Sequence, residues 1–172
     1  MNNRIFAHIF HFVIFMTMQI LLMRNMVLFN MAFCFIYIAF LLFLPIQMPK
    51  VFLLVMAFVS GITVDIFYDT IGINAASCVL LAFLRPYVLY VLTPRDDYEL
   101  NDSVNVHIMG WRWFSVYALF LVFIHHFFLF FLELGSFRQI GFTLAKVFLS
   151  TLFTFLVLVI IQLLFFSERR SR

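Results

Sequence analysis

Long uninterrupted apolar runs dominate the pattern of hydrophobic and polar positions along this chain. A run of about 18 or more apolar residues is long enough for a helix to cross a membrane. Short polar breaks, such as Arg24-Asn25, separate six such runs, which lack the two-residue alternation of membrane-spanning strands. The runs cover residues 5–23, 26–44, 51–68, 73–92, 113–132 and 141–166. The pattern predicts an all-α integral membrane protein, with one transmembrane domain over residues 1–172 that forms a six-transmembrane-helix bundle.

Composition leads to the same class of protein. Hydrophobic residues make up 66% of the 172 residues and charged residues 11%, against about 45–50% and about 25% in soluble domains. So few charges cannot cover the surface of a small soluble domain. We therefore exclude a soluble enzyme, a disordered tail and a nucleic-acid-binding module, and expect membrane lipid to be the chain's main surroundings.

The positions of the basic residues predict the orientation. With six crossings both termini lie on one side, and cytoplasmic segments carry the excess of Lys and Arg. The set on the side of the termini comprises Arg4, Lys50, Arg85, Arg95, Arg112, Arg169, Arg170 and Arg172, against Arg24, Arg138 and Lys146 for the opposite side. The larger set predicts that both termini are cytoplasmic.

Asp65 is the clearest ionisable residue inside an apolar run. It lies about 21 Å along the third predicted helix from its cytoplasmic end, which places it in the outer third of the bilayer. Such residues are costly in lipid and are candidates for a functional site. Gly61 shares its helix face, and a glycine there allows another helix to approach closely.

Several polar residues on other predicted helices lie at a similar depth. They are Lys146, His125, His126, Gln19 and Asn74. We expect them to form a polar cluster with Asp65 between the helices, toward the outer leaflet. An Asp65–Lys146 ion pair is the preferred arrangement, and a histidine partner is the second choice. Adjacent helical residues point about 100° apart, so at most one of the two histidines is expected to face the cluster.

The role of this cluster stays open at this point. A buried ion pair can simply lock helix packing, because each partner offsets the desolvation of the other; the alternative is ligand or proton handling.

The last predicted helix also carries a polar stripe along one side, formed by Thr143, Lys146, Ser150 and Thr154. The chain carries no catalytic, cofactor-binding or metal-binding motif, so we expect it not to be an enzyme and to need no cofactor.

One stretch resembles a known family. Residues 58–86, FVSGITVDIFYDTIGINAASCVLLAFLRP, resemble the signature region of the rod shape-determining protein MreD family. In that family a glycine is followed four residues later by a buried aspartate, and then by a glycine that starts the next helix and by small residues. The corresponding residues here are Gly61, Asp65, Gly72, Ala75, Ala76 and Ser77. These small residues are candidates either for contact with a partner or for packing of the third helix on the fourth.

The resemblance implies a function. MreD-like proteins are non-catalytic scaffold subunits of the rod complex, or elongasome, in the bacterial inner membrane. They bind MreC, and the complex connects MreB filaments to the peptidoglycan synthases RodA and penicillin-binding protein 2, and so to cell shape. The family fold is similar to the substrate-binding subunits of energy-coupling-factor transporters. A small-molecule-binding transporter subunit, with an outer pocket around Asp65, is therefore the alternative.

Overall fold

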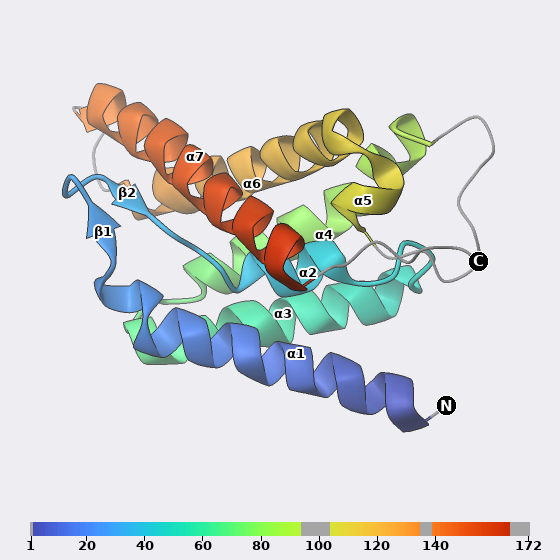
Figure 1. Cartoon of the computed structure of the whole chain (residues 1–172). Coiled ribbons are helices and arrows are strands. Elements are labelled where there is room, and N and C mark those ends of the chain that lie inside the picture. Colours follow the sequence, from blue (N-terminus) through green and yellow to red (C-terminus); the bar gives the residue numbers. More distant parts are fainter. Residues whose placement is uncertain (1, 94–103, 135–138, 166–172) are drawn as a thin grey trace.

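The computed structural model describes residues 2–93, 104–134 and 139–165, without the side chains of residues 2–5 and 7. The described chain is mostly helical, with one small hairpin (Figure 1). The helices are α1 (Asn2–Leu21), α2 (Ile38–Phe43), α3 (Lys50–Tyr68), α4 (Ile73–Val91), α5 (Val106–Met109), α6 (Trp111–Glu133) and α7 (Ile140–Phe165), with a 3-10 turn η1 (Met23–Asn25) after α1. The hairpin pairs strand β1 (Val27–Leu28) with strand β2 (Ala32–Phe33).

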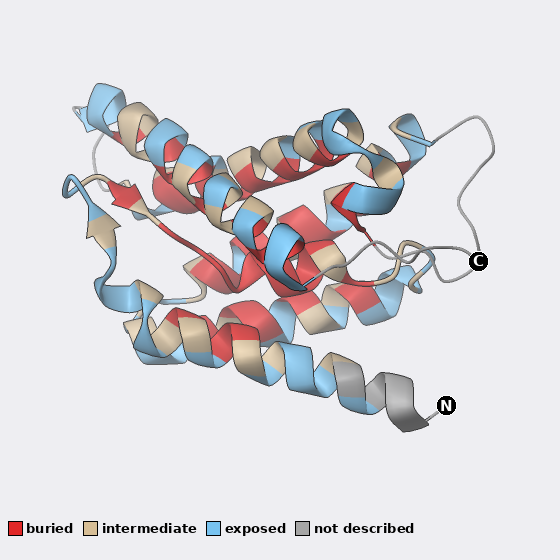
Figure 2. Cartoon of the chain, viewed as in Figure 1, coloured by how far each residue is buried: buried red, intermediate tan, exposed pale blue. Residues whose placement is uncertain are grey.

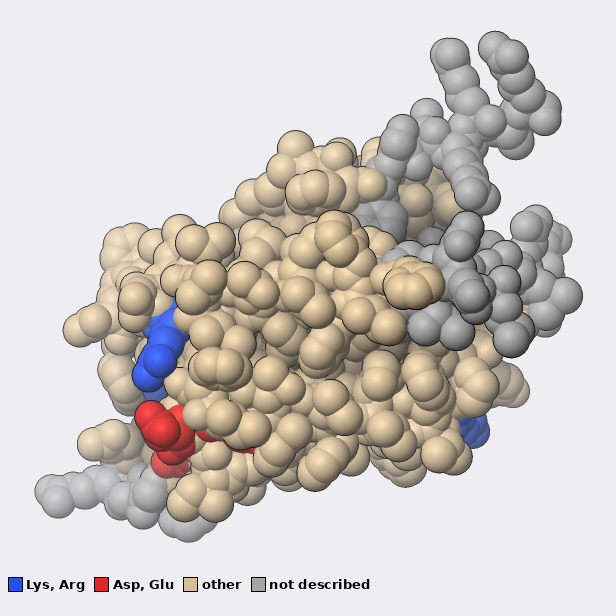
Figure 3. Space-filling model, turned by 90° about the horizontal axis from the view of Figure 1, so that it is seen from below, with Lys and Arg blue, Asp and Glu red and all other residues tan. Residues whose placement is uncertain are grey.

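Four helices in the described part of the chain, α3, α4, α6 and α7, are long and apolar enough to cross a membrane. Their outward faces carry large apolar side chains such as Phe83 and Leu152, while their inward faces are buried (Figure 2). Charged atoms lie only near the two ends of the face in Figure 3, among the residues it describes. Apolar outward faces between charged ends are the arrangement expected of helices surrounded by lipid.

The prediction of a spanning helix over residues 26–44 is wrong. This run forms the hairpin, then a short extended segment that leads into a turn at residues 36–37, and then only the six residues of α2. The hairpin turns at Phe29 and Asn30, whose φ angles are 51° and 58°. Asn tolerates this left-handed region better than most residues. The run then leads back through the bundle toward the start of α3 (Figure 1).

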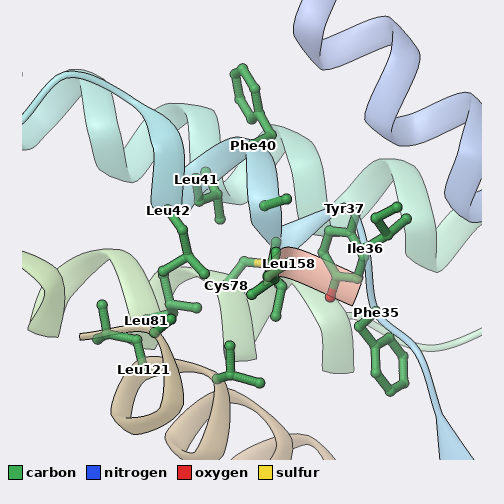
Figure 4. Packing of buried hydrophobic residues seen from close by; sticks show 14 of the residues in the cluster. Phe35, Ile36, Tyr37, Phe40, Leu41, Leu42, Cys78, Leu81, Leu121 and Leu158 are labelled. Atoms are coloured by element: carbon green, nitrogen blue, oxygen red, sulfur yellow. The ribbon is translucent and has the colours of Figure 1, made fainter. Parts of the chain in front are cut away.

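The part of this run that follows the hairpin, including α2, lies at the centre of the protein, which explains why it is hydrophobic without forming a spanning helix. Tyr37, Ile38, Leu41 and Leu42 are all 0% exposed. In Figure 4 the side chains of Cys78, Leu81, Leu121 and Leu158, from α4, α6 and α7, lie beside this segment. Irregular backbone at membrane depth is tolerated only where protein rather than lipid surrounds it. A fully buried extended run and a spanning helix both read as continuous apolar sequence, so hydropathy alone did not separate them.

Helices α3 and α4 form the closest pair in the fold. A Cβ atom on Gly61 would lie 2.3 Å from the Cα atom of Ala75, so no side chain fits between the two helices at this point. The turn between them needs two left-handed residues, Asp69 at φ 56° and Gly72 at φ 74°. This tight hairpin brings Asp65, near the end of α3, beside the start of α4.

Candidate functional site: a buried polar network

Asp65 caps helix α4 from the neighbouring helix. Its Oδ2 accepts a hydrogen bond from the amide of Ala75 (2.9 Å), and its Oδ1 accepts one from the amide of Asn74 (3.1 Å). The side chains of Thr70 and Asn74 also donate to Oδ1, the latter at 3.0 Å. The first amides of a helix lack partners within the helix and carry partial positive charge. The carboxylate of Asp65 satisfies two of them, although it is only 3% exposed.

A chain of side chains extends from Asp65 into the centre of the bundle. Because a carboxylate only accepts hydrogen bonds, the Asn74 amide group presents Nδ2 to Asp65 and leaves Oδ1 for the Tyr37 hydroxyl, 3.0 Å away. The Tyr37 oxygen in turn lies 3.0 Å from Nε2 of His125. Tyr37 has already used its single proton on Asn74, so Nε2 of His125 must be the donor. His125, Tyr37 and Asn74 therefore each donate a hydrogen bond in the direction of the Asp65 carboxylate.

His126 belongs to a different polar contact. Its Nδ1 lies 2.7 Å from the carbonyl of Val122, so this nitrogen carries the proton, and its Nε2 lies 3.2 Å from Oγ1 of Thr154. His125 and His126 are both fully buried, but only His125 reaches the Asp65 network. The two adjacent rings thus serve two networks, as their angular separation on the helix requires.

The polar stripe on α7 supplies partners for the extended segment. The amide of Phe33 donates to Oγ of Ser150 (2.9 Å), and the amide of Phe35 donates to Oγ1 of Thr154 (3.2 Å). Ser150 and Thr154 are one helical turn apart, so they match alternate amides of the extended chain. These bonds replace the strand or helix partners that the buried backbone would otherwise need.

Gln19 holds the other side of the same segment. Its Oε1 accepts from the amide of Tyr37 (3.4 Å), and its Nε2 donates to the carbonyl of Cys34 (3.3 Å) and to the hydroxyl of Tyr68 (2.8 Å). Gln19 is 1% exposed. It therefore ties α1 and α3 to the central segment rather than leaving its amide for a ligand.

The expected Asp65–Lys146 ion pair does not form. Lys146 Nζ lies 3.2 Å from Oε2 of Glu133, at the end of α6. It also sits over the rings of Phe33 (4.9 Å) and Phe130 (4.6 Å). Asp65 has instead neutral partners at a helix end, which compensate a buried charge without a second charge. A histidine reaches Asp65 only through Tyr37 and Asn74, so the second choice of a direct histidine partner is not formed either.

Arg85 is a buried charge whose role the sequence did not reveal. It was assigned to the cytoplasmic set, but its side chain is 1% exposed inside the bundle. Its Nε donates to the Tyr117 hydroxyl (2.8 Å), and its guanidinium donates to the carbonyls of Leu42, Leu44 and Pro45. These carbonyls lie at the C-terminal end of α2, where a cation is favourable. An arginine within an apolar run was the available signal.

The predicted small residues divide into two groups. Gly61, Ala75 and Ser77 are buried, and Gly61 lies directly against Ala75 in the α3–α4 contact. Ala76 is exposed and Gly72 is half-buried. Both line a shallow apolar groove of about 620 Å³ along α3 and α4, together with side chains that include Phe58, Val79 and Phe83. Internal packing therefore accounts for the first group, although Ala75 also lines the groove, while the second group faces outward.

Comparison with known proteins does not extend this picture. No protein-family model, no curated protein and no solved structure matches the chain. The coordinates establish a mostly helical protein with four membrane-compatible helices, in which two buried charges, Asp65 and Arg85, are each compensated at the end of a helix.

Proposed function

We propose that the chain is a non-catalytic membrane scaffold of the MreD type, which binds the membrane span of MreC in the rod complex. Through MreC it would connect MreB filaments to RodA and penicillin-binding protein 2 during peptidoglycan synthesis in the bacterial inner membrane. Three of the signature residues that carry the resemblance build one unit here. Gly61 permits the α3–α4 contact, Asp65 caps α4, and Gly72 forms the turn.

The α3–α4 groove is the observation that carries this proposal. Association of helices in lipid depends on close packing around small residues, since apolar burial alone gives little advantage there. Ala76 and Gly72 leave a hollow of about 620 Å³ between larger apolar side chains. A hollow of this kind on an outward face matches the requirement of a partner helix that approaches the backbone closely.

The state of the buried polar groups favours a scaffold over a pocket centred on Asp65. Both Asp65 oxygens already accept hydrogen bonds, Oδ1 from Thr70 and Asn74 and Oδ2 from Ala75. Asn74 and Gln19 also direct their amide groups to protein partners. A ligand at Asp65 would have to displace the cap of α4, and the network serves to hold helices together.

Co-purification with MreC tests the proposal. Ala76→Phe fills the groove, and Ala145→Phe makes the same change on α7, outside the residues that line the groove. Both variants should accumulate in the membrane to the same level as the unchanged chain. We expect Ala76→Phe to lower recovered MreC about tenfold or more, which corresponds to about 1.4 kcal/mol, while Ala145→Phe retains it. Equal recovery of MreC with both variants would refute docking in this groove.

A further inference from the structure

Two cavities meet at the end of the bundle where α3 passes into α4. The inner cavity, of about 260 Å³, has Gln19, Thr70 and Asn74 in its wall. The second, of about 380 Å³, opens between the ends of α6 and α7. Both are lined by Phe130, Glu133 and Lys146. The Lys146–Glu133 ion pair therefore lines both cavities.

The two members of this ion pair are held differently. The side chain of Lys146 is 18% exposed, and its ammonium group lies over the rings of Phe33 and Phe130. Contacts of a cation with ring faces hold it in place without neutralising its charge. The side chain of Glu133 is 55% exposed, and an ion pair with so exposed a member is weak. Another anion can therefore take the place of Glu133 while Lys146 stays where it is.

A second cation lines the inner cavity. Arg24, from the turn η1, lies over the ring of Tyr68 at 5.6 Å and contributes to the same wall. Among the described residues, the charged side chains that line the inner cavity are thus Arg24, Lys146 and Glu133, with an excess of one positive charge. Asp65 lies behind Thr70 and Asn74, and the amides at the start of α4 already compensate it.

We propose that the inner cavity binds a phosphate group, either the headgroup of an anionic phospholipid or a small soluble phosphate ester. Lys146 and Arg24 line the same cavity, and a phosphate offers several oxygens to such cations, with an especially good geometric match to a guanidinium group. A cavity of about 260 Å³ is large enough for a phosphate monoester or the phosphate of a lipid headgroup. In this proposal Glu133 is a competitor for Lys146 that the incoming phosphate displaces. The site is independent of MreC docking in the α3–α4 groove.

Binding measurements on the purified full chain in a neutral detergent test this site. The soluble probes are inorganic phosphate and glycerol 3-phosphate, followed by thermal stabilisation. The lipid probe is phosphatidylglycerol, followed by native mass spectrometry with phosphatidylcholine as the reference. Stabilisation by a soluble probe identifies a soluble phosphate ligand, and selective retention of phosphatidylglycerol identifies a lipid headgroup.

Three substitutions make the result specific to the cavity. Lys146→Gln should weaken binding about tenfold or more, and Glu133→Gln should strengthen it severalfold because the competing carboxylate is lost. Lys50→Gln is the matched control, since Lys50 also lies over an aromatic ring, that of Tyr87 at 5.7 Å, but does not line the cavity. If Lys146→Gln fails to fold, the opposite-signed effect of Glu133→Gln still decides. Absence of binding by every probe, or binding that Glu133→Gln leaves unchanged or weakens, would overturn the proposal.

Discussion

The Oδ2 atom of Asp65 accepts a hydrogen bond of 2.9 Å from the backbone amide of Ala75, so a residue of α3 provides the cap of α4. Ala75 is also the residue against which Gly61 packs. Gly61 and Asp65, one helical turn apart on α3, thus both hold Ala75 of α4. Gly61 does so by close packing, and Asp65 by a hydrogen bond to the backbone amide. The Gly61–Asp65 spacing in the sequence acquires a physical meaning from this relationship.

Replacing Asp65 with asparagine should destabilise the protein. Donors from Thr70, Asn74 and Ala75 converge on the carboxylate, and a carboxamide offers an NH₂ group where one of its oxygens stood. At least one buried donor then loses its partner, which costs about 1–3 kcal/mol. Reversible unfolding of the detergent-solubilised protein measures this loss.

Asp69→Asn is the control for that substitution. Asp69 is exposed, and its φ angle of 56° is one that asparagine adopts readily. We expect its free energy of unfolding to stay within about 0.5 kcal/mol of the unchanged chain. Equal effects of the two substitutions would mean that Asp65 is not the cap of α4.

A methyl group at Gly61 should push α3 and α4 apart. The added Cβ atom would lie 2.3 Å from Ala75 Cα and 2.6 Å from Ala75 N, and backbone atoms cannot move aside as a flexible side chain does. Overpacking of this kind costs about 1–3 kcal/mol. Unfolding of Gly61→Ala in detergent gives the value.

The comparison for this change is Gly141→Ala, the same substitution in α7. A Cβ atom at Gly141 meets no atom of the described residues within 4 Å, and alanine has the higher helix propensity, by up to about 1 kcal/mol. Gly141→Ala should be neutral or slightly stabilising. If Gly61→Ala proved equally harmless, the close α3–α4 approach would be incorrect.

Replacement by valine should change the stability of the protein differently at two nearby threonines of α7. Thr154 accepts from the amide of Phe35 and contacts His126, so Thr154→Val leaves buried polar groups without a partner. Thr151 is 5% exposed, and its hydroxyl has no partner among the described residues. We expect a loss of about 1–3 kcal/mol for Thr154→Val and none, or a gain, for Thr151→Val. Thermal unfolding of both variants compares them, and a larger loss at Thr151 would contradict the role of the α7 stripe.

The two adjacent histidines should adopt opposite tautomers. His125 donates from Nε2 toward Tyr37, and its Nδ1 has no partner among the described residues. His126 donates from Nδ1 to the carbonyl of Val122. Nitrogen-15 NMR of histidine-labelled protein, with the signals of His125 and His126 assigned among the five histidines, should therefore show one of these two rings in each neutral form. Two rings of the same form would contradict the direction of the Asp65 hydrogen-bond chain.

The sequence predicted the helical class and the boundaries of α3, α4, α6 and α7 to within two residues, because long apolar runs between polar breaks are a strong signal. It missed the broken run over residues 26–44, since burial in protein and burial in lipid select the same residue types. The polar stripe with Ser150 and Thr154 was visible in the sequence. Its purpose was not, because it depends on a backbone segment more than 100 residues away.

The polar cluster was predictable in membership more than in pairing. Gln19, Asn74 and Lys146 line one cavity. Asn74 also bonds to Asp65 directly, and His125 is connected to Asn74 through Tyr37. The depth of each residue along its predicted helix indicated which residues lie close together. It did not indicate the partner of each charge, because these partners are the ends of other helices. Asp65 accepts hydrogen bonds from the start of α4 instead of pairing with Lys146. Arg85 donates to carbonyls at the end of α2.

Site-specific photo-cross-linking in living cells tests the central claim, lateral contact of the α3–α4 groove with MreC, most directly. A photoreactive amino acid at Val79 lies in the groove, and one at Leu152, on the exposed face of α7, serves as the reference. The scaffold account predicts a strong cross-link to the MreC membrane span from position 79 and none from position 152. Cross-links from position 152 alone, or from neither position while the complex still co-purifies, would contradict it.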